Sequence, residues 1–185
     1  MGTNARDDSA RRVLDAALAE FVALRNELDE IGRGQRTVMN LNITLSTAIA
    51  AFVLSERGAP QLLLAIPYVS VALGLLYQTY TIHAQHMGEY INGRLRPVIV
   101  EKSGDERVFG WEDYIRATVY QTGWSQFPMR MAFMLIIPIV PLVGLIWAAP
   151  TLRTVWHWLA WSGGVLLYLV QLVSWVRLSR RFLWV

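Results

Sequence analysis

The sequence predicts an all-α integral membrane protein with four transmembrane helices. Charged residues make up 17% of the 185 residues, well below the roughly 25% of a typical soluble domain. The charges concentrate at residues 1–36 and 94–130 and are nearly absent elsewhere. The segments between the predicted spans also alternate between many and few basic residues. Together these observations indicate a chain that crosses a bilayer several times.

Four apolar stretches are long enough to cross a membrane. A hydrocarbon core of ~30 Å needs roughly 20 helical residues. The candidates are residues 37–55, 60–82, 131–149 and 152–175. The first reaches this length only with its polar half, which carries two asparagines and three hydroxyl side chains: Asn40, Asn42, Thr44, Ser46 and Thr47.

The basic residues predict the orientation. Of the 17 lysines and arginines, all but Arg57 and Arg153 lie in the two termini and the middle loop. The positive-inside rule therefore places both termini and the middle loop in the cytoplasm. We expect a multi-pass protein of the inner (plasma) membrane. Tryptophans near Arg153 fit an outer aromatic belt. The expected segments are a cytoplasmic helix (1–36), a first transmembrane hairpin (37–82), a cytoplasmic helical segment (83–130), a second hairpin (131–176) and a basic tail (177–185).

An N-terminal amphipathic helix is predicted over residues 9–31. Its apolar positions keep a heptad register, and Gly32 and Gly34 are expected to end it. One interpretation docks this helix on the middle cytoplasmic segment of its own chain. The interpretation that we favour pairs it with other copies, so that a homo-oligomer, expected to be a tetramer, forms through four apolar residues: Leu14, Phe21, Leu24 and Leu28.

Polar side chains form a stripe along each of the first two spans. The first stripe contains Asn40, Thr44, Thr47 and Ala51, and the second contains Ser70, Gln78 and Thr81. Lipid cannot satisfy these polar groups, so the stripes must face protein or water. They either hold helices together through hydrogen bonds or line a water-filled pore, and both readings stay open.

The second span is expected to continue as a helix into the cytoplasm until Pro97 stops it. Residues 111–124 then read as a helix, which either lies along the cytoplasmic interface or packs on its neighbours.

Several classes of function find no support in the sequence. The chain has no cysteine, no familiar catalytic motif and no charged residue in the centre of a span, so an enzyme or an ion-coupled transporter is not expected. His83, His86 and Glu89 turn about 60° apart at each step along a helix, so they converge poorly on a metal ion. No cofactor is expected. Topology explains the basic pI without a nucleic-acid duplex as partner.

Four short motifs, "ALRNEL", "AIPYVS", "GEYINGRLRP" and "GWEDY", occur in this order within residues 23–116. In these motifs the chain resembles a group of small uncharacterised bacterial membrane proteins that are frequent in actinobacteria. Some proteins of similar appearance are membrane effectors of phage-defence systems such as the Hailong type. The resemblance implies a pore controlled by a nucleotide-derived ligand or by a cytoplasmic protein, and it assigns no binding residue.

These observations predict a homo-oligomeric gated pore, with the lipid bilayer and other copies of the chain as its partners. The alternative is a non-conducting scaffold or sensor that recruits a cytoplasmic partner.

Overall fold

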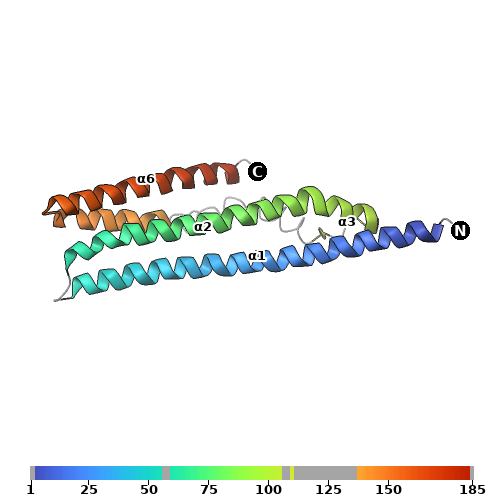
Figure 1. Ribbon diagram of the computed structural model, residues 1–185, viewed down its shortest axis with the longest axis horizontal. Coiled ribbons are helices and arrows are strands. Elements are labelled where there is room, and N and C mark those ends of the chain that lie inside the picture. Colours follow the sequence, from blue (N-terminus) through green and yellow to red (C-terminus); the bar gives the residue numbers. More distant parts are fainter. Residues whose placement is uncertain (1–2, 56–58, 106–108, 111–136, 184–185) are drawn as a thin grey trace. The chain divides into compact units, whose positions relative to one another are not determined.

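The computed structural model describes residues 3–55, 59–105, 109–110 and 137–183, and these contain helices and no strand. Three helices are long and apolar enough to cross a membrane: Ala10–Leu54, Pro60–Ser103 and Val155–Leu178. The expectation of an all-helical chain with membrane-length helices is confirmed. Figure 1 colours the chain from its N-terminus to its C-terminus and labels helices α1 (Thr3–Leu54), α2 (Ala65–Tyr90), α3 (Arg96–Ser103) and α6 (Val155–Leu183).

Helix α1 runs without interruption from Thr3 to Leu54. The prediction that Gly32 and Gly34 end an N-terminal helix is therefore wrong. A glycine inside a helix costs up to about 1 kcal/mol relative to alanine, but it does not force a break. Ile31 and Val38 on either side of the glycines are both buried, so packing on each side holds the chain helical through them.

The second membrane-length helix is built from several connected parts. A 3₁₀ turn, η1 (Pro60–Leu64), leads into α2 (Ala65–Tyr90). A π-helical turn, η2 (Ile91–Leu95), then joins α2 to α3 (Arg96–Ser103).

Pro97 does not stop this helix, contrary to the sequence prediction. It occupies the first turn of α3, where a missing N–H group costs little. Just before it, the N–H group of Arg96 donates to the carbonyl of Ile91, five residues earlier. This wider turn changes the hydrogen-bond pattern immediately ahead of the proline ring, so the helix continues to Ser103.

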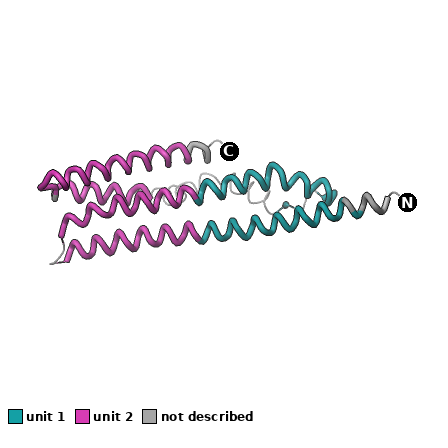
Figure 2. Tube along the Cα trace, in the orientation of Figure 1, with its two compact units in different colours: residues 1–33, 80–128 teal, residues 34–79, 129–185 magenta. Residues whose placement is uncertain are grey.

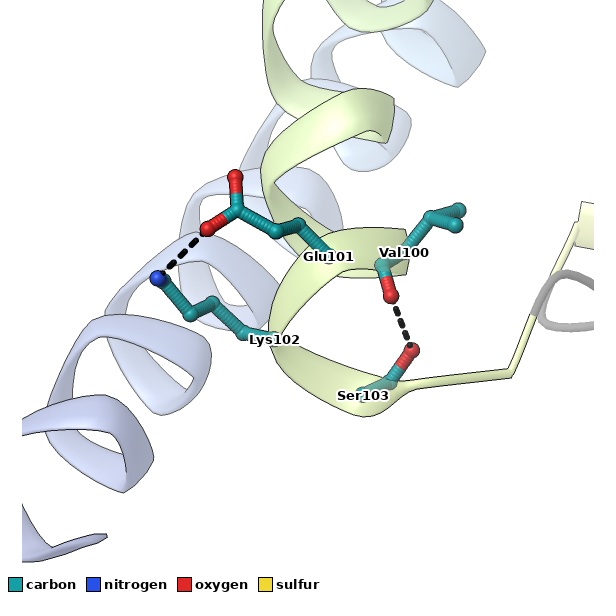
Figure 3. A network of polar contacts seen from close by, with 4 residues as sticks. All are labelled: Val100, Glu101, Lys102 and Ser103. Carbon is teal, nitrogen blue, oxygen red and sulfur yellow. Dashed lines mark hydrogen bonds and ion pairs between the residues drawn. The ribbon is translucent and has the colours of Figure 1, made fainter.

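Helix α3 ends in a left-handed glycine. Gly104 has a φ of 67° and donates its N–H group to the carbonyl of Val100. Figure 3 shows the neighbouring polar contacts, in which Ser103 also donates to Val100 and Lys102 donates to Glu101 at 2.7 Å. The Lys102 ammonium holds the pKa of the Glu101 carboxyl below its ordinary value.

The C-terminal part contains an apolar helix, Ile137–Ala148, a 3₁₀ turn, η4 (Ala149–Thr151), and helix α6 (Val155–Leu183). The predicted interfacial helix at residues 111–124 lies outside the described residues. So do residues 131–136 of the predicted third span.

The chain forms two compact units, which Figure 2 colours separately. Unit 1 contains residues 1–33 and 80–128, and unit 2 contains residues 34–79 and 129–185. Helices α1 and α2 each contribute to both units.

The core of unit 1 forms where α1 meets α3. Buried Ala17 on α1 packs with Leu95 and Ile99, and with Phe109 beyond α3. Ile99 is completely buried. The core also includes three of the predicted oligomerisation residues, because Leu14, Phe21 and Leu24 pack against this cluster.

An aromatic pair with an arginine at each end adds to this core. The rings of Phe21 and Phe109 meet edge to face, with their centroids 5.3 Å apart. The guanidinium of Arg25 lies 5.6 Å from the centroid of Phe21, and that of Arg96 lies 5.5 Å from the centroid of Phe109. Both distances are typical of cation–π contacts, which extend the packing to the surface of unit 1.

The core of unit 2 joins η1 and the start of α2 to the end of helix 137–148. Leu63, Leu64, Ile66 and Ala148 are buried together there. Close approach of helices depends on small residues, since a methyl group on Gly144 would lie only 2.9 Å from Cγ2 of Ile66.

Two side-chain hydrogen bonds to backbone oxygens tie the same end of unit 2. The Trp161 indole donates to the carbonyl of Leu145 at 3.0 Å, and the Tyr68 hydroxyl donates to the carbonyl of Ala160. Each bond gives the polar end of an aromatic side chain a hydrogen-bond partner while its ring packs on the neighbouring helix.

Candidate functional site

The polar stripe predicted on the first span faces away from the rest of the chain. Asn40, Thr44, Thr47 and Ala51 are all exposed on α1. Their spacing of four, three and four residues places them on one face of the helix. None of the hydrogen bonds found between described residues involves the polar side chains of this face.

The opposite face of α1 packs against its own unit. Val38 and Asn42 are buried there, and Ser46, Ile49 and Val53 are half-buried. At about 100° per residue, the centre of this inner face lies nearly opposite the centre of the exposed polar stripe. Helix α1 therefore has two polar faces within unit 2, an inner one that includes Asn42 and an outer one that includes Asn40.

The inner polar residues form a small buried network. The Ser70 hydroxyl on α2 donates to Oδ1 of Asn42 at 2.7 Å. The Ser46 hydroxyl lies 3.4 Å from that of Ser70. Asn42 is 2% exposed and Ser70 is completely buried, so the network holds α1 against α2 where water does not reach.

Asn42 lies in this inner network but was not among the residues of the two predicted polar stripes. A usable signal was present, because Gln35, Val38 and Asn42 extend the heptad spacing of the N-terminal stripe. If the heptad register is continued past Gly32 and Gly34, it predicts Asn42 on the packed face of the helix.

The predicted polar face of the second span is largely used inside the chain. Ser70 belongs to the network with Asn42, and Gln78 is 4% exposed. Nε2 of Gln78 donates to the backbone oxygen of Gln171 on α6 at 3.4 Å. Thr81, which lies in unit 1, is half-buried and also interacts within the chain. Ser70 and Gln78 therefore join helices of unit 2.

Gln171 makes an unusually close contact with α2. Its side chain packs against Gly74, where an added methyl group would overlap Nε2 of Gln171. Gln171 is 1% exposed, and neither polar atom of its amide has a hydrogen-bond partner among the described residues. Gly74 thus provides the space in which α6 buries a polar side chain.

The other outward faces in the described part of unit 2 are mainly apolar, with Thr79, Ser162 and Arg177 among the exposed polar residues. Helix 137–148 exposes only apolar side chains, among them Ile139, Val143 and Ile146. Helix α6 exposes a longer series of the same kind: Val155, Trp156, Trp158, Leu159, Leu166, Leu167, Leu169, Val170, Val173 and Val176. Such faces suit lipid, whereas the described part of α1 in unit 2 carries a continuous exposed polar stripe that does not.

The predicted oligomerisation residues lie on the packed face of α1 in unit 1. Leu14, Phe21 and Leu24 contact the core, and Leu28 is half-buried. This arrangement corresponds to the first interpretation of the heptad stripe, in which the helix docks on its own chain.

A hydrogen bond at the surface of unit 1 joins Tyr90 on α2 to Glu20 on α1 at 2.7 Å. The Tyr90 hydroxyl donates to the carboxylate, and this bond, followed by repulsion from the charge of Glu20, raises the pKa of Tyr90 above its ordinary value.

No metal site is found in the part of the chain that the structure describes, because no three histidine or acidic side chains gather closely enough there. His83 and His86 are both exposed. No protein-family model, curated protein or solved structure matches the chain.

Proposed function

We propose that the protein is a four-span membrane protein, in which unit 2 crosses the bilayer and unit 1 lies in the cytoplasm. The exposed apolar faces of α6 and of helix 137–148 support a lipid environment for unit 2. The concentration of basic residues in the termini and the middle loop supports a cytoplasmic position for unit 1.

We further propose that several copies assemble into a gated pore, with α1 lining its axis. The observation that carries this proposal is the exposed polar face formed by Asn40, Thr44 and Thr47. Within a bilayer, unsatisfied amide and hydroxyl groups are costly against lipid, so this face needs water or another protein chain. A symmetric oligomer around a water-filled axis supplies both.

The exposed side chains that flank this face are apolar. Leu41, Leu45 and Phe52 lie on one side of it, and Ile43 and Leu54 lie on the other. Apolar flanks can pack against neighbouring copies while the polar strip between them faces the axis. This pattern is the one expected of a pore-lining helix.

A non-conducting scaffold is the second candidate, and one feature of unit 1 favours it. Val13, Leu18 and Val22 on α1 are exposed apolar residues, with Val22 57% exposed. A cytoplasmic partner could cover these side chains. In that case the outer polar face would form hydrogen bonds between copies instead of lining a pathway for ions.

Cysteine accessibility distinguishes the two candidates. The protein has no native cysteine, so single cysteines can be placed at Asn40, Thr44, Thr47 and Ala51 without background. In a pore, a hydrophilic thiol reagent added from the cytoplasm should react at Asn40 and Thr44 and should react less beyond Thr47. A cysteine at the buried Asn42 serves as the matched control and should stay unreactive.

Conduction completes the test. Reconstituted protein should carry current in planar bilayers, and Asn40→Leu with Thr44→Val should reduce that current while the oligomer persists in native mass spectrometry. A monomer in native mass spectrometry would remove the proposed axis. Unreactive cysteines at the outer positions in both resting and activated protein would instead assign this face to helix packing.

A further inference from the structure

The outer polar face of α1 continues beyond Asn40 to two arginines. Positions 33, 36, 40, 44 and 47 are spaced by three or four residues and therefore share one side of the helix. Arg33 and Arg36 are both exposed. Arg33 interacts within the chain, and Arg36 lies one turn before Asn40.

The charge along this part of α1 has a single sign. Between Gly32 and Ser55 the sequence contains Arg33 and Arg36 and no aspartate or glutamate. The positive-inside rule explains why arginines lie at the cytoplasmic end of a span, but it does not select a face of the helix. Here Ile31 and Val38 define the packed face, and Arg36 lies on the side that also carries Asn40.

The polar side chains farther along this face can bind an anion as it passes. The amide N–H groups of Asn40 and the hydroxyls of Thr44 and Thr47 can donate hydrogen bonds to it. Cation-selective pores commonly use rings of carboxylates or of backbone carbonyls. Between Arg33 and Thr47 the outer face of α1 offers no carboxylate, and the nearest carboxylate on this side is that of Asp29, one turn before Arg33. The backbone carbonyls of this stretch are used in the helix.

We propose that the pore selects small inorganic anions such as chloride, with Arg36 as the residue that determines selectivity. This inference rests on the proposed pore. In a symmetric oligomer each copy contributes one Arg36, so the guanidinium groups form a ring at the cytoplasmic mouth. The field of this ring raises the local concentration of anions and lowers that of cations.

The test measures the reversal potential of the reconstituted full-length protein in planar bilayers under a tenfold KCl gradient. The unmodified protein should prefer chloride over potassium by about threefold to tenfold. This preference should weaken near 1 M salt, where the Debye length falls to about 3 Å. Arg36→Gln should reduce the preference, and Arg36→Glu should reverse the sign of the reversal potential.

Arg177→Glu is the matched control, because Arg177 is also exposed and lies on α6 instead of α1. It changes the charge by the same amount and should leave the reversal potential nearly unchanged.

A second approach avoids variants that assemble poorly. Arg36→Cys can be modified after assembly, since the chain has no other cysteine. A cationic thiol reagent should restore the preference for chloride, and an anionic reagent should produce a preference for potassium.

Three outcomes would overturn the inference while leaving the pore intact. They are a cation preference in the unmodified protein, equal shifts from Arg36→Glu and Arg177→Glu, and no difference between the two reagents at Arg36→Cys. Absence of current under all conditions has a different meaning, because it removes the proposed pore and the selectivity with it.

Discussion

Ser70 and Asn42 join α2 to α1 through a buried hydrogen bond of 2.7 Å. Asn40, only two residues from Asn42 along the chain, is exposed on the opposite side of α1. Two asparagines of one span therefore have different surroundings, and they form a matched pair for mutation.

Asn42→Leu should destabilise unit 2 by about 1–3 kcal/mol, because it removes the nearer acceptor of the buried Ser70 hydroxyl and leaves the longer contact with Ser46. Thermal or denaturant unfolding in detergent micelles would measure the loss. Asn40→Leu should have little effect on the unfolding of the single chain, since Asn40 is exposed and its side chain makes no hydrogen bond to another described residue. A larger loss at Asn40 than at Asn42 would contradict the assignment of the two faces.

Gly74→Ala should destabilise unit 2 by about 1–3 kcal/mol, because the added methyl group overlaps the Gln171 side chain. The double variant Gly74→Ala with Gln171→Ala should recover part of this loss, and a double-mutant cycle measures the recovery. Gly32→Ala is the control, since nothing lies near that position and alanine favours a helix. Purely additive effects at positions 74 and 171 would show that the two residues do not meet.

Ile99→Ala should cost about 2–5 kcal/mol in unit 1, because it leaves a cavity between α1 and α3. Limited proteolysis of the intact protein should then show faster cleavage within residues 80–105, a range that belongs to unit 1. Val98→Ala, at an exposed neighbouring position, should leave the cleavage rate nearly unchanged. Equal protection in both variants would place the core of unit 1 elsewhere.

Glu20→Gln should lower the pKa of Tyr90 toward its ordinary value near 10, because the hydrogen bond to the Glu20 carboxylate and the repulsion from its charge raise it. The neutral phenol is the form that the fold favours. Its contribution to stability is therefore complete below the unfolded pKa and is lost as pH rises through the higher folded pKa. Ultraviolet titration of the tyrosines, with Tyr90→Phe to assign the signal, measures the change. An unchanged midpoint for Tyr90 would rule out the contact in solution.

The helical content was predictable because apolar length and charge placement are properties of whole segments. They identified membrane-length helices without any knowledge of tertiary contacts. Helix ends were not predictable in the same way. Gly32 and Pro97 are weak helix residues, but the packing of Ile31 and Val38, and the π-helical turn before Pro97, outweigh their local preferences.

The candidate site likewise has features that the sequence predicts and features that depend on tertiary contacts. Helical periodicity grouped Asn40, Thr44 and Thr47 on one face, and the structure leaves that face exposed. Periodicity alone could not tell which polar side chains have partners within the chain. Ser70 and Gln78 read as a possible lining, yet their surroundings depend on Asn42 of α1 and Gln171 of α6, which are distant in sequence.

The π-helical turn at Ile91–Leu95 gives the chain one spare residue at this point. A π-turn accommodates one more residue than the α-turn that it replaces, and the helix continues beyond it on the same faces. Deleting Gly93 would therefore convert the π-turn into an α-turn and keep Ile99 facing Ala17 and Phe109. Deleting Val98 from α3 would instead rotate the residues that follow by about 100° and turn Ile99 away from this core.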